Sequence, residues 1–139
     1  YSKERKYWQD RGFGFIEIDY RGSTNYGINY RKSLNGNWGI YDTQDVIDVI
    51  NYLPKMGLYD PKKIILKGSS AGGFTLLNSL CENIDVVCAS CYYGVSDLGG
   101  LLNDTHKFES GYTNSLIGVN KNKSNLESLL QSRSPILKI

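Results

Sequence analysis

Hydrophobic residues recur along the chain with spacings that alternate between those of helices and those of strands. Residues 41–57 place five aliphatic side chains at helical spacing, and residues 74–81 do the same with four apolar side chains. Residues 13–18, 64–66 and 85–93 are runs rich in apolar residues that predict strands. The predicted order is therefore strand, helix, strand, helix, strand. Such alternation is typical of the α/β class with a parallel, doubly wound sheet.

Shorter pieces are predicted on either side of this pattern. Residues 1–12 resemble the end of a charged helix, with Gly12 as its C-terminal stop. Asp42 is placed to cap the N-terminus of the long helix that follows the first strand. In the last third of the chain the pattern predicts two short amphipathic helices, at residues 98–103 and 125–131.

The composition describes a single globular unit. With 139 residues, 40% of them hydrophobic and 22% charged, the chain can bury one core but hardly two. The net charge is +2 and no block of basic residues occurs, so the electrostatic footprint of a nucleic-acid binder is missing. No apolar run approaches the roughly 20 residues that span a bilayer. Neither a nucleic-acid partner nor a membrane partner is indicated.

Three cysteines, Cys81, Cys88 and Cys91, include one C-x-x-C pair. Such a pair suggests redox or zinc chemistry when it lies at a turn or at the start of a helix. Here it lies in the predicted strand at 85–93, where residues three apart point to opposite faces. No second ligand pair exists to complete a tetrahedral metal site. We therefore expect buried, unpaired thiols in a reducing compartment and no bound metal.

The run GSSAGG at residues 68–73 carries the strongest signal for chemistry. It follows a predicted strand and precedes a predicted helix, which is the setting in which a hydrolase exposes a nucleophilic serine on a sharp turn. Ser70 is the candidate nucleophile, and the backbone amide of Ala71 would face the oxyanion. Gly68 and Gly72 would allow the strained turn and the close approach of strand to helix. The alternative is a glycine-rich turn before an ordinary helix.

Five motifs occur in order along the chain. They are DYRGSTNYG at 19–27, NGNWG at 35–39, the GSSAGG run, YYGVSDL at 92–98 and DTHKFES at 104–110. Together they resemble the catalytic domain of prolyl oligopeptidase family serine peptidases, and within that family the acylaminoacyl-peptidase and dipeptidyl-aminopeptidase branch, over nearly all 139 residues. The resemblance implies an α/β-hydrolase fold with a Ser-Asp-His triad. It also implies an N-terminal β-propeller that restricts access to short peptides.

The resemblance assigns roles to individual residues. Ser70 matches the nucleophile, and Ala71 supplies one oxyanion amide. Val95 and Leu98 fall where family members line the pocket for the residue before the scissile bond. Apolar residues just past a strand are also common in cores, so packing is an open alternative for these two. Residues 20–21 resemble a structural loop of the family beside the active site, and we expect them to pack.

Asp97 and His106 follow Ser70 in the order Ser, Asp, His that α/β-hydrolases use. They are nine residues apart with no intervening strand, whereas the acid and the base of this fold lie on loops after later strands. In the resembling family, the motif that contains His106 is distinct from the catalytic histidine. We therefore expect the acid and the base beyond residue 139. Residues 1–139 would then form a single incomplete hydrolase domain, without propeller or triad-bearing segment, that is nearly inactive alone.

The favoured hypothesis is a serine peptidase that hydrolyses short or N-terminally blocked peptides through an acyl-enzyme intermediate and needs no cofactor. A carboxylesterase is the runner-up, because the SSAGG run also resembles the hormone-sensitive-lipase elbow; the motifs at 19–27 and 35–39 favour the peptidase. A non-catalytic interaction module with a hydrolase fold is the third hypothesis. Family resemblance and unpaired cysteines predict a cytoplasmic location. A partial sheet leaves edges unpaired, so we expect the chain to self-associate.

Overall fold

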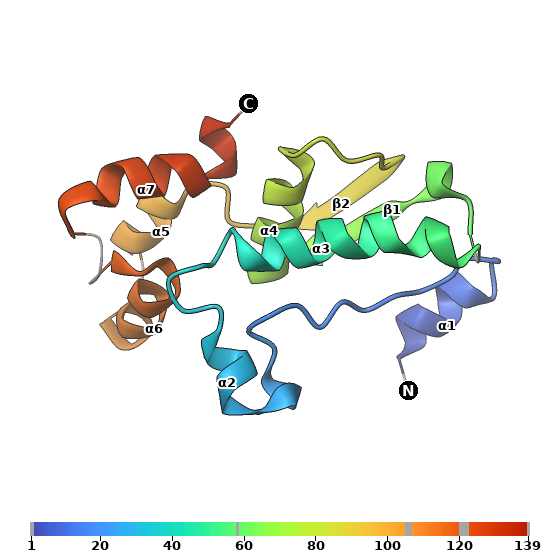
Figure 1. Ribbon diagram of the computed structural model, residues 1–139, viewed down its shortest axis with the longest axis horizontal. Coiled ribbons are helices and arrows are strands. Elements are labelled where there is room, and N and C mark those ends of the chain that lie inside the picture. Colours follow the sequence, from blue (N-terminus) through green and yellow to red (C-terminus); the bar gives the residue numbers. More distant parts are fainter. Residues whose placement is uncertain (1, 58, 105–106, 120–122, 139) are drawn as a thin grey trace.

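Two parallel strands and the helix that connects them lie at the centre of the fold (Figure 1). The computed structural model describes residues 2–57, 59–104, 107–119 and 123–138. Strand β1 (Ile65–Ser69) pairs with β2 (Cys88–Tyr92), with Ile65 opposite Cys88. Helix α4 (Ala71–Leu80) makes the crossover that two parallel strands require. This strand, helix, strand unit confirms the prediction for this part of the chain.

Helix α3 (Tyr41–Tyr52) packs against α4 and continues into a 3-10 turn (Leu53–Met56). A left-handed Gly57, with a φ of 65°, ends this stretch. The long helix predicted here is confirmed, but its predicted cap is wrong. Ile40 occupies the N-cap position, and Asp42 lies inside the first turn with a fully buried side chain. The carboxylate is held there because it accepts a hydrogen bond from the amide that precedes the cap.

The strand predicted at residues 13–18 does not form. The segment follows α1 (Lys3–Gln9) and runs to the turn before α2 without strand structure (Figure 1). A strand requires a hydrogen-bonded neighbour, and this segment has no partner strand among the described residues. Residues 16–21 lie instead beside α3, where the two segments line one pocket. The described sheet therefore has two strands where the sequence predicted three.

The second half of the chain is mainly helical. Helices α5 (Leu98–Asp104), α6 (Lys107–Ile117) and α7 (Leu126–Arg133) lie at the end of the molecule away from α1 (Figure 1). Helices α5 and α7 confirm the two predicted amphipathic pieces. The other helical elements of the described residues are α2 (Gly27–Lys32) and 3-10 turns at Thr24–Tyr26, Pro61–Lys63, Lys123–Asn125 and Pro135–Leu137. None of the described helices has the length and apolar character needed to cross a membrane.

The hydrophobic core joins α4 to the helices of the second half. Its buried apolar side chains are Leu34, Trp38, Phe74, Leu98, Leu116 and Ile117. The rings of Trp38 and Phe74 have centroids 4.5 Å apart, and Phe74 has no exposed surface. Helix α4 is therefore fixed in the core by the fourth of its residues. The loop before α3 contributes Trp38, so this loop, α4 and α5 share one core.

The expectation of buried thiols is wrong for Cys88 and Cys91, which are exposed, while Cys81 is partly buried. All three are free cysteines. Cys91 lies on the face of β2 that meets α4, where its Sγ is 3.9 Å from the carbonyl oxygen of Gly73.

Candidate active site

The turn between β1 and α4 has the backbone shape of a nucleophile elbow. Ser70 lies between the last strand residue, Ser69, and the first helical residue, Ala71, with φ 51° and ψ −121°. Its amide donates to the carbonyl of Tyr92 at 3.0 Å, and its carbonyl accepts from the amide of Phe74 at 3.1 Å. One backbone group thus extends the strand pairing and the other starts the helix. A positive φ at a residue other than glycine is strained, and such strain is concentrated at functional sites.

The Ser70 hydroxyl is not used as a helix cap. Serine at an N-cap position commonly accepts a hydrogen bond from an amide in the first turn. Ser70 occupies the N-cap position of α4, yet its side chain makes no capping hydrogen bond. The residue is exposed. Its hydroxyl is therefore presented outward at the junction of strand and helix.

Glycines permit the close contacts around this turn. A Cβ added to Gly68 would lie 2.3 Å from the carbonyl oxygen of Gly72, and one added to Gly73 would lie 2.6 Å from the Cα of Gly94. A Cβ added to Gly72 would meet nothing within 4 Å. The role predicted for Gly68 is confirmed. The second position at which a side chain has no room is Gly73 rather than Gly72.

The buried carboxyl group of Asp42, on α3, forms a hydrogen bond with Thr75 on α4. Its Oδ2 accepts from the Thr75 hydroxyl at 2.6 Å, and its Oδ1 accepts from the Gly39 amide at 2.7 Å. Burial raises the pKa of Asp42, and these two hydrogen bonds oppose the rise. Burial also raises the pKa of Tyr20, and the negative charge of Asp42 raises it further. Burial lowers the pKa of Arg133, and the negative charge of Asp42 opposes this decrease.

The segment that precedes α2 is fixed to α3 by Arg21. Its amide donates to Asp45 Oδ2 at 2.7 Å and its Nε donates to Asp45 Oδ1 at 2.9 Å. The guanidinium carbon lies 4.1 Å from the ring centroid of Tyr41. These contacts agree with the packing role expected for residues 20–21.

The two residues expected to line a substrate pocket follow β2: Val95 lies in the segment before α5, and Leu98 is the first residue of α5. Leu98 has no exposed surface, belongs to the core, and donates its amide to Ser134 Oγ at 3.0 Å. A fully buried side chain contacts no substrate in this conformation, so packing is the role that the structure shows for Leu98. Val95 is partly buried against the same core. Its place in a substrate pocket stays a prediction.

Asp97 is engaged as a helix cap. Its Oδ1 accepts from the amide of Gly99 at 2.8 Å, and its carbonyl accepts from the amide of Leu101 at 3.1 Å. Both bonds are those of an N-cap residue of α5. His106, which follows Asp97 in the order expected of a triad, lies outside the described residues. The structural role expected for His106 stays a prediction.

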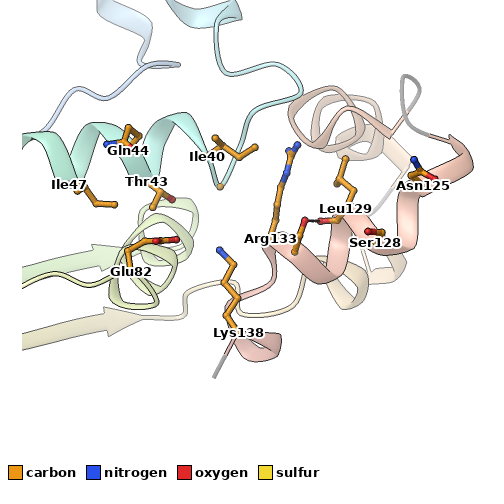
Figure 2. Close-up of a pocket in the computed structure, with 12 residues that line it drawn as sticks. Ile40, Thr43, Gln44, Ile47, Glu82, Asn125, Ser128, Leu129, Arg133 and Lys138 are labelled. Atoms are coloured by element: carbon orange, nitrogen blue, oxygen red, sulfur yellow. Dashed lines mark hydrogen bonds between the residues drawn. The ribbon is translucent and has the colours of Figure 1, made fainter.

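A cavity of about 560 Å³ lies between α3 and α7 (Figure 2). Its charged lining residues are Glu82, Arg133 and Lys138. The side chains of Arg133 and Lys138 extend toward the space between the two helices (Figure 2). Neither Ser70 nor Ala71 lines this cavity, so it is separate from the candidate active site.

Comparisons with known proteins agree with this geometry. The chain matches the prolyl oligopeptidase family over residues 1–135. It is 36% identical over 74 residues to acylamino-acid-releasing enzyme 1 of Oryza sativa subsp. japonica. This match covers 53% of this chain and 10% of that relative. The chain is 26% identical to dipeptidyl peptidase family member 6 of Caenorhabditis elegans over 98% of this chain and 19% of that relative.

Solved structures extend the agreement to the backbone. A Mycobacterium tuberculosis puromycin-hydrolyzing peptidase matches with a TM-score of 0.88 at 38% identity, over 96% of this chain and 20% of that one. A puromycin hydrolase matches with a TM-score of 0.84 at 35% identity, and the match covers 95% of this chain and 20% of that one. The matched parts of the chain thus cover between 10% and 20% of the length of these relatives. Because the match in sequence and backbone runs along almost all of its residues, the chain belongs to the prolyl oligopeptidase family and contains part of an α/β-hydrolase fold.

Proposed function

We propose that this protein is a serine peptidase in which Ser70 attacks a peptide carbonyl and forms an acyl-enzyme. The observation that supports this most directly is the φ of 51° at Ser70, which presents an exposed hydroxyl at the junction of β1 and α4. The relatives named above support it as well, because they bear the names of peptidases.

The proposed reaction has two halves. A base takes the proton of Ser70 Oγ as this oxygen bonds to the substrate carbonyl carbon. The carbonyl oxygen becomes an oxyanion, to which the Ala71 amide donates. Ala71 begins α4, so its N–H has no partner within the helix and the positive end of the helix dipole points the same way. The base then protonates the leaving amine, and water releases the acyl group by the reverse sequence of proton transfers.

The base and the acid of the triad are proposed to be a histidine and an aspartate outside residues 1–139. The capping bond of Asp97 supports this, because its carboxylate is already engaged at the start of α5. The greater length of the relatives leaves room for these residues and for an N-terminal propeller. Without the base, Ser70 would be nearly unactivated, and residues 1–139 alone would show only a residual rate.

The proposed substrates are short or N-terminally blocked peptides. The names of two of the relatives given above, an acylamino-acid-releasing enzyme and a dipeptidyl peptidase family member, support this class. Val95 is the remaining candidate for contact with the residue before the scissile bond. The reaction needs no cofactor, because all its steps are nucleophilic attack and proton transfer.

A small substrate panel tests the proposal on the full-length protein. N-acetyl-alanine p-nitroanilide and alanyl-alanine p-nitroanilide report peptidase activity, and p-nitrophenyl acetate reports esterase activity. We expect hydrolysis of at least one anilide, with kcat/KM lowered by about 10⁴-fold or more in Ser70→Ala. Ser69→Ala, a change in the adjacent strand residue, should retain the activity. Hydrolysis of the ester alone would favour the carboxylesterase, and no hydrolysis would favour an interaction module.

A further inference from the structure

Helices α3 and α4 are joined by a buried hydrogen bond between Asp42 and Thr75. The two residues are 0% and 2% exposed, and the Thr75 hydroxyl lies 2.6 Å from Asp42 Oδ2. Either side chain can donate in this bond, so the contact persists whether or not the carboxyl group is protonated. A buried polar group that loses its partner is costly. The first turn of α3 therefore has a fixed place against α4.

Thr75 also contacts the turn that carries the proposed oxyanion donor. Its hydroxyl lies 3.2 Å from the carbonyl oxygen of Ala71, one helical turn earlier. Ala71 directly follows Ser70, whose carbonyl accepts the first hydrogen bond of the helix from Phe74. The Thr75 hydroxyl carries one proton, so it donates either to the Asp42 carboxylate or, when a protonated Asp42 donates to it, to the Ala71 carbonyl. Thr75 therefore lies in contact with both Asp42 and the residue after the nucleophile. A shift of Thr75 would move the turn in which Ser70 and Ala71 lie.

The loop before α3 makes a second contact with the same helix. The Trp38 ring packs on Phe74 with a centroid distance of 4.5 Å. Gly39 has a φ of 81°, and a Cβ added there would lie 2.9 Å from Phe74 Cζ. The Gly39 amide also donates to Asp42. The loop therefore reaches two successive residues of α4, Phe74 directly and Thr75 through the Asp42 carboxylate.

We propose that Asp42 and Thr75 are positioning residues for Ser70: their hydrogen bond fixes the first turn of α4 and thereby orients the Ser70 hydroxyl and the Ala71 amide. The proposal rests on the proposed function, because it requires that Ser70 reacts. A strained backbone such as that of Ser70 persists only where the surrounding structure over-determines it. A displacement of about 1 Å at a catalytic group lowers a rate by about 100-fold, so a small loss of fixation would be measurable.

The test uses the full-length protein and two measurements on each variant. One is the second-order rate constant for modification of Ser70 by a fluorophosphonate, and the other is the midpoint of thermal unfolding. Thr75→Val and Asp42→Ala each remove one side of the bond. We expect either change to lower the rate constant by about 10-fold to 100-fold at a temperature where the protein is folded. The fold-loss in the double variant should be smaller than the product of the two single losses, because both single variants already lack the Asp42–Thr75 bond.

Three further variants separate positioning from folding. Thr75→Ser keeps the hydroxyl, and Asp42→Asn keeps an acceptor for the Gly39 amide and a donor for Thr75, so both should react close to the wild-type rate. Ser79→Ala removes another buried hydroxyl of α4, which donates to the carbonyl of Thr75 at 2.8 Å. This control should lower the unfolding midpoint and leave the rate constant unchanged. With a peptide substrate, Thr75→Val should lower kcat with little change in KM.

The outcomes distinguish the two proposals. A wild-type rate constant in Thr75→Val and Asp42→Ala, with a lower unfolding midpoint, would overturn the positioning role and leave Ser70 as the nucleophile. Absence of labelling at Ser70 in the wild-type protein would overturn the proposed function and the positioning role together. A reduced rate constant in the two variants, restored in Thr75→Ser, is the result that the positioning role predicts.

Discussion

Ser70 holds its positive φ at a point where three chain segments meet with little room for side chains. Gly68 faces the carbonyl of Gly72, and Gly73 faces Gly94 after β2. The sequence shows a serine between glycines, but it does not show which of the glycines faces a neighbouring segment. That distinction depends on how α4 crosses the two strands, and it yields a matched pair of variants.

Gly68→Ala should disturb the elbow, whereas Gly72→Ala should be tolerated. The first places a Cβ 2.3 Å from backbone, so the strand and the helix must separate, at a cost of about 1–3 kcal/mol. The second adds a methyl group to an open position within a helix, where alanine is favoured over glycine by about 0.5–1 kcal/mol. Thermal unfolding of the full-length variants measures the difference. Equal midpoints for the two variants would contradict the elbow geometry.

Asp42 should make stability depend on pH. Burial raises its pKa above the value in the unfolded chain, so its contribution to stability is complete at low pH and is lost as the pH rises through the raised pKa. Asp42→Asn does not titrate. Its urea midpoint should therefore rise relative to that of the wild type as the pH increases above 3.8, the ordinary pKa of an aspartate, and through the raised pKa of Asp42. A difference in midpoint that stays constant, or that moves the other way, would show that burial does not control this carboxyl group.

At the scale of elements, helices α1, α3, α4, α5 and α7 and the strand pair could be predicted because their signals are local, whereas α2 and α6 were not predicted. The aliphatic spacing of α3 and the run before GSSAGG each lie within one element. The segment at 13–18 has similar residues, but a strand exists only together with a hydrogen-bonded neighbour, and that pairing is not a local property.

Burial was harder to predict than secondary structure. Asp42 has the sequence signature of a helix cap, yet its position within the first turn of α3 buries it against α4. Leu98 has the sequence position of a pocket residue, yet the packing of α5 places it in the core. In both cases the outcome depends on contacts between elements that are distant in sequence. The position of Ser70 on the elbow depended only on the adjacent strand and helix, and it could be predicted.

Phe74 should be the main anchor of α4. It is fully buried and packs against Trp38, so Phe74→Ala should cost about 3–5 kcal/mol through lost burial and a cavity. Tyr52, at the end of α3, is 59% exposed, and Tyr52→Ala should change stability by no more than about 0.5 kcal/mol. Thermal unfolding compares the two truncations. A midpoint for Phe74→Ala as high as that for Tyr52→Ala would show that α4 is anchored elsewhere.

At the scale of the whole molecule, the described sheet consists of two strands, each with one unpaired edge. Several large apolar side chains on or next to these strands are exposed, namely Ile65, Val87, Tyr92 and Tyr93. Unpaired strand edges with apolar neighbours are sites of association between chains. The 139-residue chain prepared alone is therefore expected to behave differently from the full-length protein.

The isolated chain should self-associate in a concentration-dependent way. Val87, beside β2, is 66% exposed, and Val87→Lys should shift the equilibrium toward the monomer because an edge lysine opposes strand pairing. Sedimentation velocity over a concentration series measures both effects. A monomer that persists to high micromolar concentration in the unsubstituted chain would contradict this expectation.

The central claim is that the hydroxyl of Ser70 is the nucleophile of a serine hydrolase. The most direct measurement is mass spectrometry of the full-length protein after treatment with a fluorophosphonate, with peptide mapping of the adduct. The account predicts a single adduct on Ser70 that is absent in Ser70→Ala and present in Ser69→Ala. An unmodified wild-type protein, or an adduct on another residue that survives in Ser70→Ala, would contradict it.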